Sequence, residues 1–243
     1  MSKMIAIWGA PNSGKTAFAV KLASAIYEQY SSTVLMLSCD NITPSLPVLF
    51  PNYKSDELYS VGVPLSKTEI TQQELIKSIV TLKNKINLGF LGYKDGENKF
   101  TYPDYDEEKA HALLEGLKSL ADFVIVDCIS SLDNVLSSVA IQEADEVIRL
   151  ATPTLKCISF FASQLPLYAD PKYTLDRQII GLNVIESNCY MPIDEVKNHL
   201  KEVSFTLPYC HEIRQQTVDG ELFKPVSDKK YTSKFKAIAD KVV

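Results

Sequence analysis

Glycine, lysine and threonine recur in residues 9–16, GAPNSGKT, at the spacing of a loop that holds phosphate groups. An apolar run precedes this segment and an amphipathic stretch follows it. Glycines allow the backbone to approach phosphate oxygens closely, and the N–H groups at the start of a helix carry partial positive charge. We therefore predict a nucleotide-phosphate site. A glycine turn that binds nothing is the alternative. The predicted cradle comprises Gly9, Ala10, Pro11, Asn12, Ser13, Gly14, Lys15, Thr16 and Ala17.

Three side chains are predicted to act on the phosphates and on a metal ion. Lys15 would reach the β- and γ-phosphates, and the Thr16 hydroxyl would coordinate Mg²⁺. A second metal ligand is expected at the end of another buried strand, and Asp127 closes the apolar run FVIV at residues 123–126. We therefore predict that Thr16 and Asp127 hold Mg²⁺, with Lys15 and Asp127 taking part in catalysis.

Asp40 closes a second apolar run, VLMLSC, at residues 34–39. Ligands of open α/β sheets bind at the carboxyl ends of the strands. Asp40 is therefore predicted to face the γ-phosphate and its attacking water, as a third catalytic residue. The alternative is an aspartate that caps the turn before Pro44.

Alternating strand and helix patterns must position these residues. Helical patterns are expected at 15–29, 72–86, 106–120, 193–200 and 233–243, with a further helix starting at Thr152 and Pro153. Strands are expected at 4–8, 33–37, 88–91, 123–126, 146–150, 179–185 and 203–207. The alternation predicts an α/β fold, a three-layer doubly wound and mostly parallel sheet. Without a linker-like stretch, residues 1–243 are predicted to form a single P-loop domain.

Composition excludes several classes of protein. The 243 residues are 46% hydrophobic and 23% charged, as in an ordinary globular protein. The net charge of −5 disfavours a dedicated nucleic-acid binder. Only three arginines accompany 22 lysines, which disfavours a small-molecule kinase that clamps two charged substrates. The five cysteines show no C-x-x-C spacing, and the first apolar run is too short for a secretory signal. We therefore expect a cytoplasmic protein.

The whole pattern resembles the ParA/MinD family of ATPases, and within it the pilus- and mobile-element-associated branch typified by TadZ and CpaE. The likeness lies in four stretches. They are the loop 9–16, the strand ending in Asp40, the run ADFVIVD at 121–127, and ADEVI at 144–148 followed by Ala151, Thr152 and Pro153. The later segment FTLPYCHEIR at 205–214 resembles the family's late strand and its proline-containing loop. By the same likeness Pro208 and Tyr209 would lie against adenine, and Asn188 would contact the purine.

This resemblance implies an ATPase with ATP and Mg²⁺ as cofactors. It also implies a homodimer that forms with ATP, separates after hydrolysis to ADP, and positions pilus machinery, a plasmid or a mobile element. A protein partner in a positioning, secretion or conjugation system would follow.

The loop departs from the family pattern at three positions. The family places a lysine that crosses to the partner's ATP directly after the first glycine, where this chain has Ala10. Pro11 and Asn12 replace the next two residues, and Ser38 replaces an acid in the second strand. These departures predict slow hydrolysis. The alternative is an ATP-binding scaffold with little or no hydrolysis that acts through partner contacts.

Two other enzyme classes share such a loop. A GTPase should carry N-K-x-D on a late strand, whereas the nearest match here, NKIN at 84–87, ends in asparagine and precedes Asp127. A kinase is disfavoured by the arginine count. Both classes therefore rank below the ATPase.

The C-terminal segment 224–243 carries six lysines and two aspartates, a local charge of +4. Phe235, Ile238, Ala239 and Val242 would share one helix face. A last helix packed on the domain is favoured. Contact with a membrane or with DNA is the alternative, and the membrane contact would place the protein at the inner face of the membrane.

Overall fold

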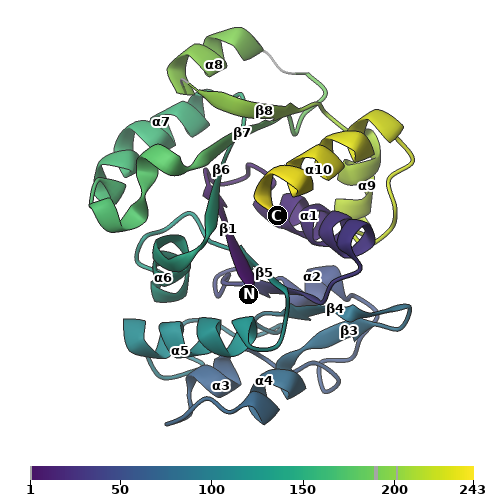
Figure 1. The fold of residues 1–243 in the computed structure, drawn as a ribbon, viewed down its shortest axis with the longest axis vertical. Coiled ribbons are helices and arrows are strands. Elements are labelled where there is room, and N and C mark those ends of the chain that lie inside the picture. The colour runs from purple at the N-terminus through teal and green to yellow at the C-terminus, as the bar shows by residue number, and fades with distance from the viewer. Residues whose placement is uncertain (1, 189–190, 201) are drawn as a thin grey trace.

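The computed structural model describes residues 2–188, 191–200 and 202–243. Its centre is one eight-stranded sheet in the order β3-β4-β2-β5-β1-β6-β7-β8 (Figure 1). Neighbouring strands are parallel except β3 and β4, so the predicted doubly wound, mostly parallel sheet is confirmed. The strands are β1 (Lys3–Gly9), β2 (Val34–Ser38), β3 (Val80–Leu82), β4 (Lys85–Leu91), β5 (Phe123–Asp127), β6 (Glu146–Ala151), β7 (Ile179–Asn183) and β8 (Val203–Leu207).

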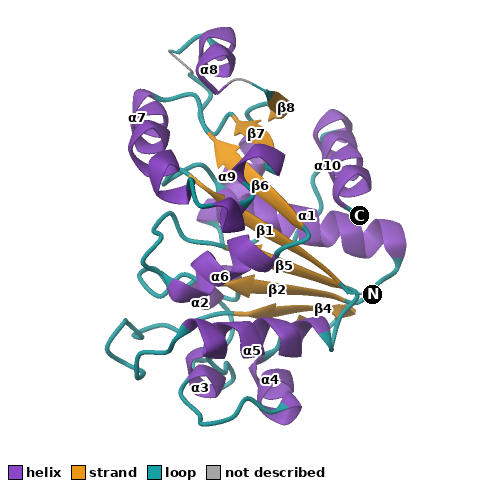
Figure 2. Cartoon of the chain, turned by 60° about the vertical axis from the view of Figure 1, so that its left-hand side comes forward, coloured by secondary structure: helices purple, strands orange, loops and turns teal. Residues whose placement is uncertain are grey.

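Helices cover both faces of this sheet and make the second and third layers (Figure 2). One face carries α3 (Gly62–Leu65), α4 (Gln72–Ser78), α5 (Glu107–Lys118), α6 (Val135–Glu143), α7 (Leu155–Gln164) and α8 (Ile193–Leu200). The other carries α1 (Lys15–Tyr30), α2 (Leu46–Leu49), α9 (His211–Val218) and α10 (Lys229–Val242). Three short 3₁₀ turns follow α7, at Leu165–Tyr168, Pro171–Tyr173 and Leu175–Arg177.

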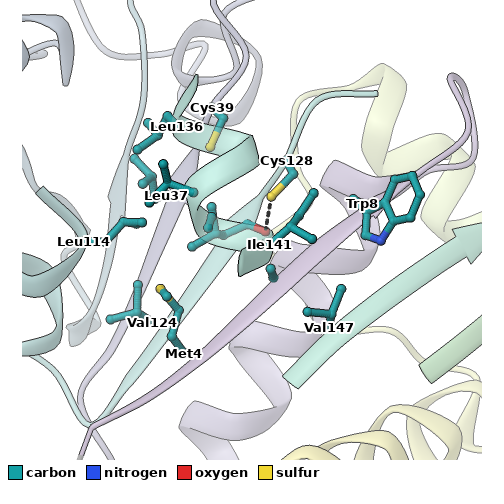
Figure 3. Close-up of a cluster of buried hydrophobic side chains, with 14 of the residues drawn as sticks. Met4, Trp8, Leu37, Cys39, Leu114, Val124, Cys128, Leu136, Ile141 and Val147 are labelled. Carbon is teal, nitrogen blue, oxygen red and sulfur yellow. Dashed lines mark hydrogen bonds between the residues drawn. The ribbon is translucent and has the colours of Figure 1, made fainter. Parts of the chain in front are cut away.

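The central strand β1 shows why the strands read as unbroken apolar runs. Met4 and Trp8 point into the core beneath α6 and α7, where Figure 3 shows them in one cluster of buried side chains with Val124 and Val147. Ile5 and Ile7 point into the opposite core beneath α1 and α10. Because both faces are covered, every residue from Met4 to Trp8 is fully buried and polar alternation is absent.

The register of the sheet brings the predicted site residues to one edge. Asp127, the last residue of β5, stands opposite Ile7 of β1 and Ser38 of β2. The chain beyond Ser38 stays paired, since the Cys39 N–H donates to the Asp127 carbonyl at 3.0 Å. The phosphate loop, Asp40 and Asp127 therefore leave the sheet side by side.

The helix expected at residues 72–86 is wrong in its second half. Helix α4 starts at a Thr71–Glu74 capping box and ends at Ser78, and the chain then forms β3, a turn at Lys83 and Asn84, and β4. The run of β-branched residues at 79–81 favours a strand, and Val80 pairs with Phe90. Tertiary pairing thus overrides the helical spacing.

The helix expected to start at Thr152 and Pro153 starts two residues later. Thr154 is the N-cap of α7, and its hydroxyl accepts the Cys157 N–H at 3.2 Å. The Thr154 N–H donates to the Thr152 carbonyl at 2.8 Å, so Thr152 and Pro153 form a tight turn after β6. Helices α6 and α9 were not predicted; α9 begins inside the segment taken as the proline-containing loop.

The C-terminal helix α10 packs on α1. Phe235, Ile238, Ala239 and Val242 are at most 4% exposed and belong to the core on that face. Within the described ranges, no helix combines the length and the apolar character that crossing a membrane requires. Four cysteines in those ranges are free, and Cys189 lies outside them.

Candidate functional site

The loop between β1 and α1 depends on its two glycines. Gly9 adopts φ +147°, and a side-chain carbon at this position would overlap the carbonyl oxygen of Leu150 on β6. Gly14 is the N-cap of α1 in the left-handed conformation with φ +78°. Asn12 is also left-handed, with φ 56°. The backbone therefore takes the conformation that a phosphate cradle needs, and the helix N-terminus faces the cavity.

The ammonium group of Lys15 lies over this loop. It donates to the carbonyl of Ala10 at 3.0 Å, to the carbonyl of Gly9 at 3.4 Å and to the Ser130 hydroxyl at 2.8 Å. Burial lowers the pKa of Lys15, and the negative charges of Asp127 and Asp40 oppose that shift. Ser130 was not predicted, because only the fold shows that the loop after β5 reaches this lysine.

The Thr16 hydroxyl donates to a carboxylate oxygen of Asp127 at 2.6 Å. These two residues are 111 positions apart, and the parallel pairing of β1 with β5 brings them together. Asp127 is 3% exposed, and burial raises its pKa to about 6, although Thr16 and Lys15 both act in the opposite direction. A hydroxyl and a carboxylate at this distance are a donor set that suits Mg²⁺.

The pKa of Asp127 predicts how stability depends on pH. Its folded pKa of about 6 exceeds the ordinary 3.8, so the folded state holds the proton more tightly. This contribution to stability is fully present below pH 3.8 and is lost as the pH rises through about 6. Asp127→Asn removes the titrating group. As the pH rises from 4 to 8, we expect the free energy of unfolding of the variant to increase by about 2 kcal/mol relative to that of the wild type.

Urea unfolding with EDTA at a series of pH values would measure this difference. Asp133→Asn is a matched control at a more exposed aspartate six residues along the chain, and its difference from the wild type should change little with pH. Parallel wild-type and Asp127→Asn profiles would contradict the assigned cause of the pKa shift.

Asp40 lies two residues beyond the end of β2. One of its carboxylate oxygens accepts the N–H groups of Ile42 at 2.9 Å and Thr43 at 2.7 Å. It therefore caps the turn, as the alternative interpretation proposed, while also lining the same cavity as Lys15 and Asp127. Turn capping leaves its second oxygen available to a ligand.

One cavity of about 940 Å³ joins these residues. The volume accommodates a nucleotide. Its wall includes residues from the phosphate loop, the ends of β2, β5 and β7, and helix α9. They are Pro11, Asn12, Gly14, Lys15, Thr16, Ala17, Asp40, Asp127, Ser130, Asn183, Tyr209 and Arg214, among others.

Two of the predicted base contacts lie elsewhere. Asn188 is exposed and lines a cleft beside Thr154 and Glu195 that adjoins the cavity and shares residues 184–186 with it. Pro208 is absent from the described wall of the cavity. Asn183, at the end of β7, lines the cavity and donates its amide N–H to the Ser13 carbonyl at 2.9 Å. The sequence pattern predicts a strand over 179–185, which places Asn183 inside the strand. The structure ends β7 at Asn183, and a polar residue that closes an apolar strand is the signal that could have identified it.

Solved structures provide the comparison for this geometry, because no protein-family model and no curated protein sequence matches the chain. MinD from Pyrococcus horikoshii OT3, solved with Mg-ADP, superposes with a TM-score of 0.72 at 20% identity, covering 100% of this chain and 96% of that one. A ParA-family ATPase from Chlorobium tepidum TLS gives a TM-score of 0.78 at 16% identity, covering 98% and 99%.

The chain has the ParA/MinD ATPase fold. MinD from Aquifex aeolicus, solved in complex with MinC, also superposes, with a TM-score of 0.74 at 16% identity over 99% of this chain and 95% of that one. The ParA/MinD fold predicted from the sequence is therefore confirmed along nearly the whole chain. The TadZ/CpaE branch stays a prediction.

Proposed function

We propose that residues 1–243 form a single ParA/MinD-like ATPase domain that binds ATP and Mg²⁺ and hydrolyses ATP slowly. The observation that carries this proposal is the Thr16–Asp127 pair at 2.6 Å beside a glycine-stabilised loop and a buried lysine. The residues fit the absent groups, since the loop has room for phosphate oxygens and the pair offers oxygen ligands.

Each residue of the site has one task in this proposal. The backbone N–H groups of residues 10–16 bind the phosphates, and Lys15 turns its ammonium from the loop carbonyls toward the β- and γ-phosphates. Thr16 and Asp127 hold Mg²⁺, which when bound supplies positive charge beside the phosphates. Asp40 orients the attacking water with its free carboxylate oxygen.

The base would lie at the other end of the cavity. Asn183 and Tyr209 line it there, together with Arg214 of α9. An amide side chain can both donate to and accept from a purine edge, and a phenol ring can pack on it. We assign the purine-contacting amide to Asn183, because Asn183 lines the cavity itself whereas Asn188 lines only the adjoining cleft.

The position of Ala10 supports slow turnover in this proposal. Ala10 is fully buried and packs in the core beneath α6 and α7, so no side chain at this position extends from the loop toward a second subunit. The degenerate scaffold therefore stays a second candidate. In both versions ATP binds. In the ATPase, dimerisation depends on nucleotide and the cargo predicted from the sequence is pilus machinery, a plasmid or a mobile element, whereas the scaffold acts through partner contacts.

Molar mass by light scattering, with and without Mg²⁺-ATP, tests the proposed function. We expect the mass to rise from 27.1 kDa to twice that value when ATP is added, with slow phosphate release in the same samples. ADP should leave the mass at 27.1 kDa. ATP binding without a rise in mass and without phosphate release would select the scaffold instead. Absence of ATP binding would reject both.

Asp40→Ala separates binding from turnover in the same assay. It should retain ATP affinity within a few-fold and release phosphate more slowly. Asp56→Ala, at an exposed aspartate that does not line the cavity, is the matched control. Undiminished phosphate release in Asp40→Ala would remove Asp40 from the mechanism.

A further inference from the structure

A second large cavity, of about 1220 Å³, lies away from the phosphate loop. Its described wall is formed by strand β6, helix α7, the 3₁₀ turns after α7, the end of α8 and Glu202, at the corner of the molecule where Figure 2 shows α7 and α8 beside the sheet. Much of its wall is apolar, contributed by Ile158, Phe161, Leu165, Leu175 and Leu200. Among the residues that the structure describes, none lines both this cavity and the nucleotide cavity.

A buried arginine forms part of this wall. Arg149 of β6 is 9% exposed, and its guanidinium lies 5.8 Å from the centre of the Phe161 ring. Within residues 2–188, 191–200 and 202–243, no carboxylate lies within 4.0 Å of it and no group accepts a hydrogen bond from its side chain. Burial alone lowers its pKa. An unpaired buried charge is costly, so an anion from outside the chain would relieve that cost.

The distribution of arginine in the chain supports an anion site here. Two of the three arginines, Arg149 and Arg177, line this cavity, and no lysine in the described ranges does so. A guanidinium presents a planar fork of N–H donors that matches a carboxylate, whereas an ammonium is a compact point charge. Arg177 is exposed whereas Arg149 is buried, so the cavity wall carries one solvent-facing and one buried arginine.

The remaining charges on the wall select the kind of anion. Asp170, Asp176 and Glu202 are exposed and line the same cavity. Their negative charge repels a polyphosphate or another strongly charged anion. A single negative charge on an apolar body meets less repulsion, and the apolar wall would cover that body.

We propose that this cavity binds an organic monocarboxylate, with the carboxylate on Arg149 and an apolar body against Phe161 and Leu165. The proposal is independent of ATP binding at the phosphate loop. The carboxylate could belong to a free small molecule or to the chain end of a peptide, and the experiment separates these two sources.

Trp8 makes binding at this cavity visible. It is the only tryptophan in the chain, it stands opposite Arg149 in the pairing of β1 with β6, and its ring centre lies 6.1 Å from that of Phe161. A ligand on Arg149 and Phe161 therefore changes the surroundings of the indole. Its emission can be followed while calorimetry measures the dissociation constant.

The probe is 4-phenylbutanoate, with 4-phenylbutanamide as its uncharged counterpart. We expect the acid to bind the wild type with a dissociation constant below about 1 mM, with a change in Trp8 emission over the same concentrations. The amide should bind at least about tenfold more weakly, because it cannot form a charge-assisted pair. Arg149→Met should weaken binding of the acid at least about tenfold.

Two further variants complete the test. Arg177→Gln should weaken binding of the acid a few-fold. It also keeps the proposal testable if circular dichroism shows that Arg149→Met does not fold. Lys236→Gln removes an exposed positive charge on α10 and should leave the dissociation constant unchanged. Absence of saturable binding by 4-phenylbutanoate, or equal binding to Arg149→Met, would overturn the proposal.

A short peptide ending in phenylalanine separates the two sources of the carboxylate. The chain end of a peptide would be supported if this peptide binds more tightly than 4-phenylbutanoate and if binding is lost when its C-terminal carboxylate is replaced by an amide. Tighter binding of 4-phenylbutanoate would support a small molecule. Absence of binding by both acids would contradict the site.

Discussion

Lys15→Ala should weaken ATP binding at least about hundredfold while leaving the fold intact. The ammonium of Lys15 is the positive side chain nearest the predicted position of the phosphates, 3.0 Å from the Ala10 carbonyl inside the loop. Losing a charge-assisted contact to a phosphate costs about 3 kcal/mol, which is a factor of about a hundred in the dissociation constant. Calorimetric titration with ATP and Mg²⁺ would measure it.

The fold should tolerate this change because burial opposes the charge of Lys15. Burial lowers its pKa, so removing the ammonium also removes a desolvation cost, against the loss of its hydrogen bonds to Ala10 and Ser130. We expect the urea midpoint to change little. Ser130→Ala is the matched control, since it removes one partner of the lysine and should change ATP affinity only a few-fold. Unchanged ATP affinity in Lys15→Ala would reject the site assignment.

The phosphate loop and its flanking elements could be predicted from the sequence because the signals there are local. The glycine spacing and the apolar run at 4–8 predict β1 and α1 within one or two residues of their bounds. Asp127 could be predicted too, since a residue that ends a buried parallel strand must lie at the ligand-binding edge of the sheet. Its 2.6 Å contact with Thr16 follows from this shared edge.

Other features depended on pairing between distant segments. Residues 79–91 form the hairpin of β3 and β4 because Val80 can pair with Phe90, and helical spacing in the sequence carries no information about that partner. Asn183 ends the apolar run of β7 and Asn188 follows it five residues later, and only the position at which the strand ends decides which of them faces the loop. Tertiary structure therefore chose between alternatives that local pattern left equal.

The arginines show the same limit. In the sequence, Arg149 is one charged residue inside the run EVIRLA, and its solvent exposure cannot be derived from that run. Strand β6 is covered by α7 on the face to which Arg149 points, so the guanidinium is buried against Phe161. The low arginine count disfavours a kinase. The structure adds that two of the three arginines line one cavity.

Gly9→Ala should destabilise the protein more than any other single change in the loop. The φ of +147° is unfavourable for alanine, and the added carbon would overlap the Leu150 carbonyl oxygen across the β1–β6 ladder. The same oxygen accepts the Ala10 N–H at 3.3 Å, so relief of the overlap would move the start of the phosphate loop away from β6. We expect a loss of about 3 kcal/mol in the free energy of unfolding, measured by urea denaturation, together with weaker ATP binding.

Gly96→Ala is the matched control for this prediction. Gly96 also has a positive φ, +78°, but an added carbon there would meet no atom within 4 Å. It therefore isolates the backbone cost of alanine in a left-handed conformation, about 1 kcal/mol. Any loss in Gly9→Ala beyond that of Gly96→Ala reflects the overlap with β6 together with the more unfavourable φ of Gly9. Equal losses in the two variants would show that β1 and β6 can separate locally without loss of stability. In that case the close approach of the two strands at Gly9 would not be what fixes the position of the loop.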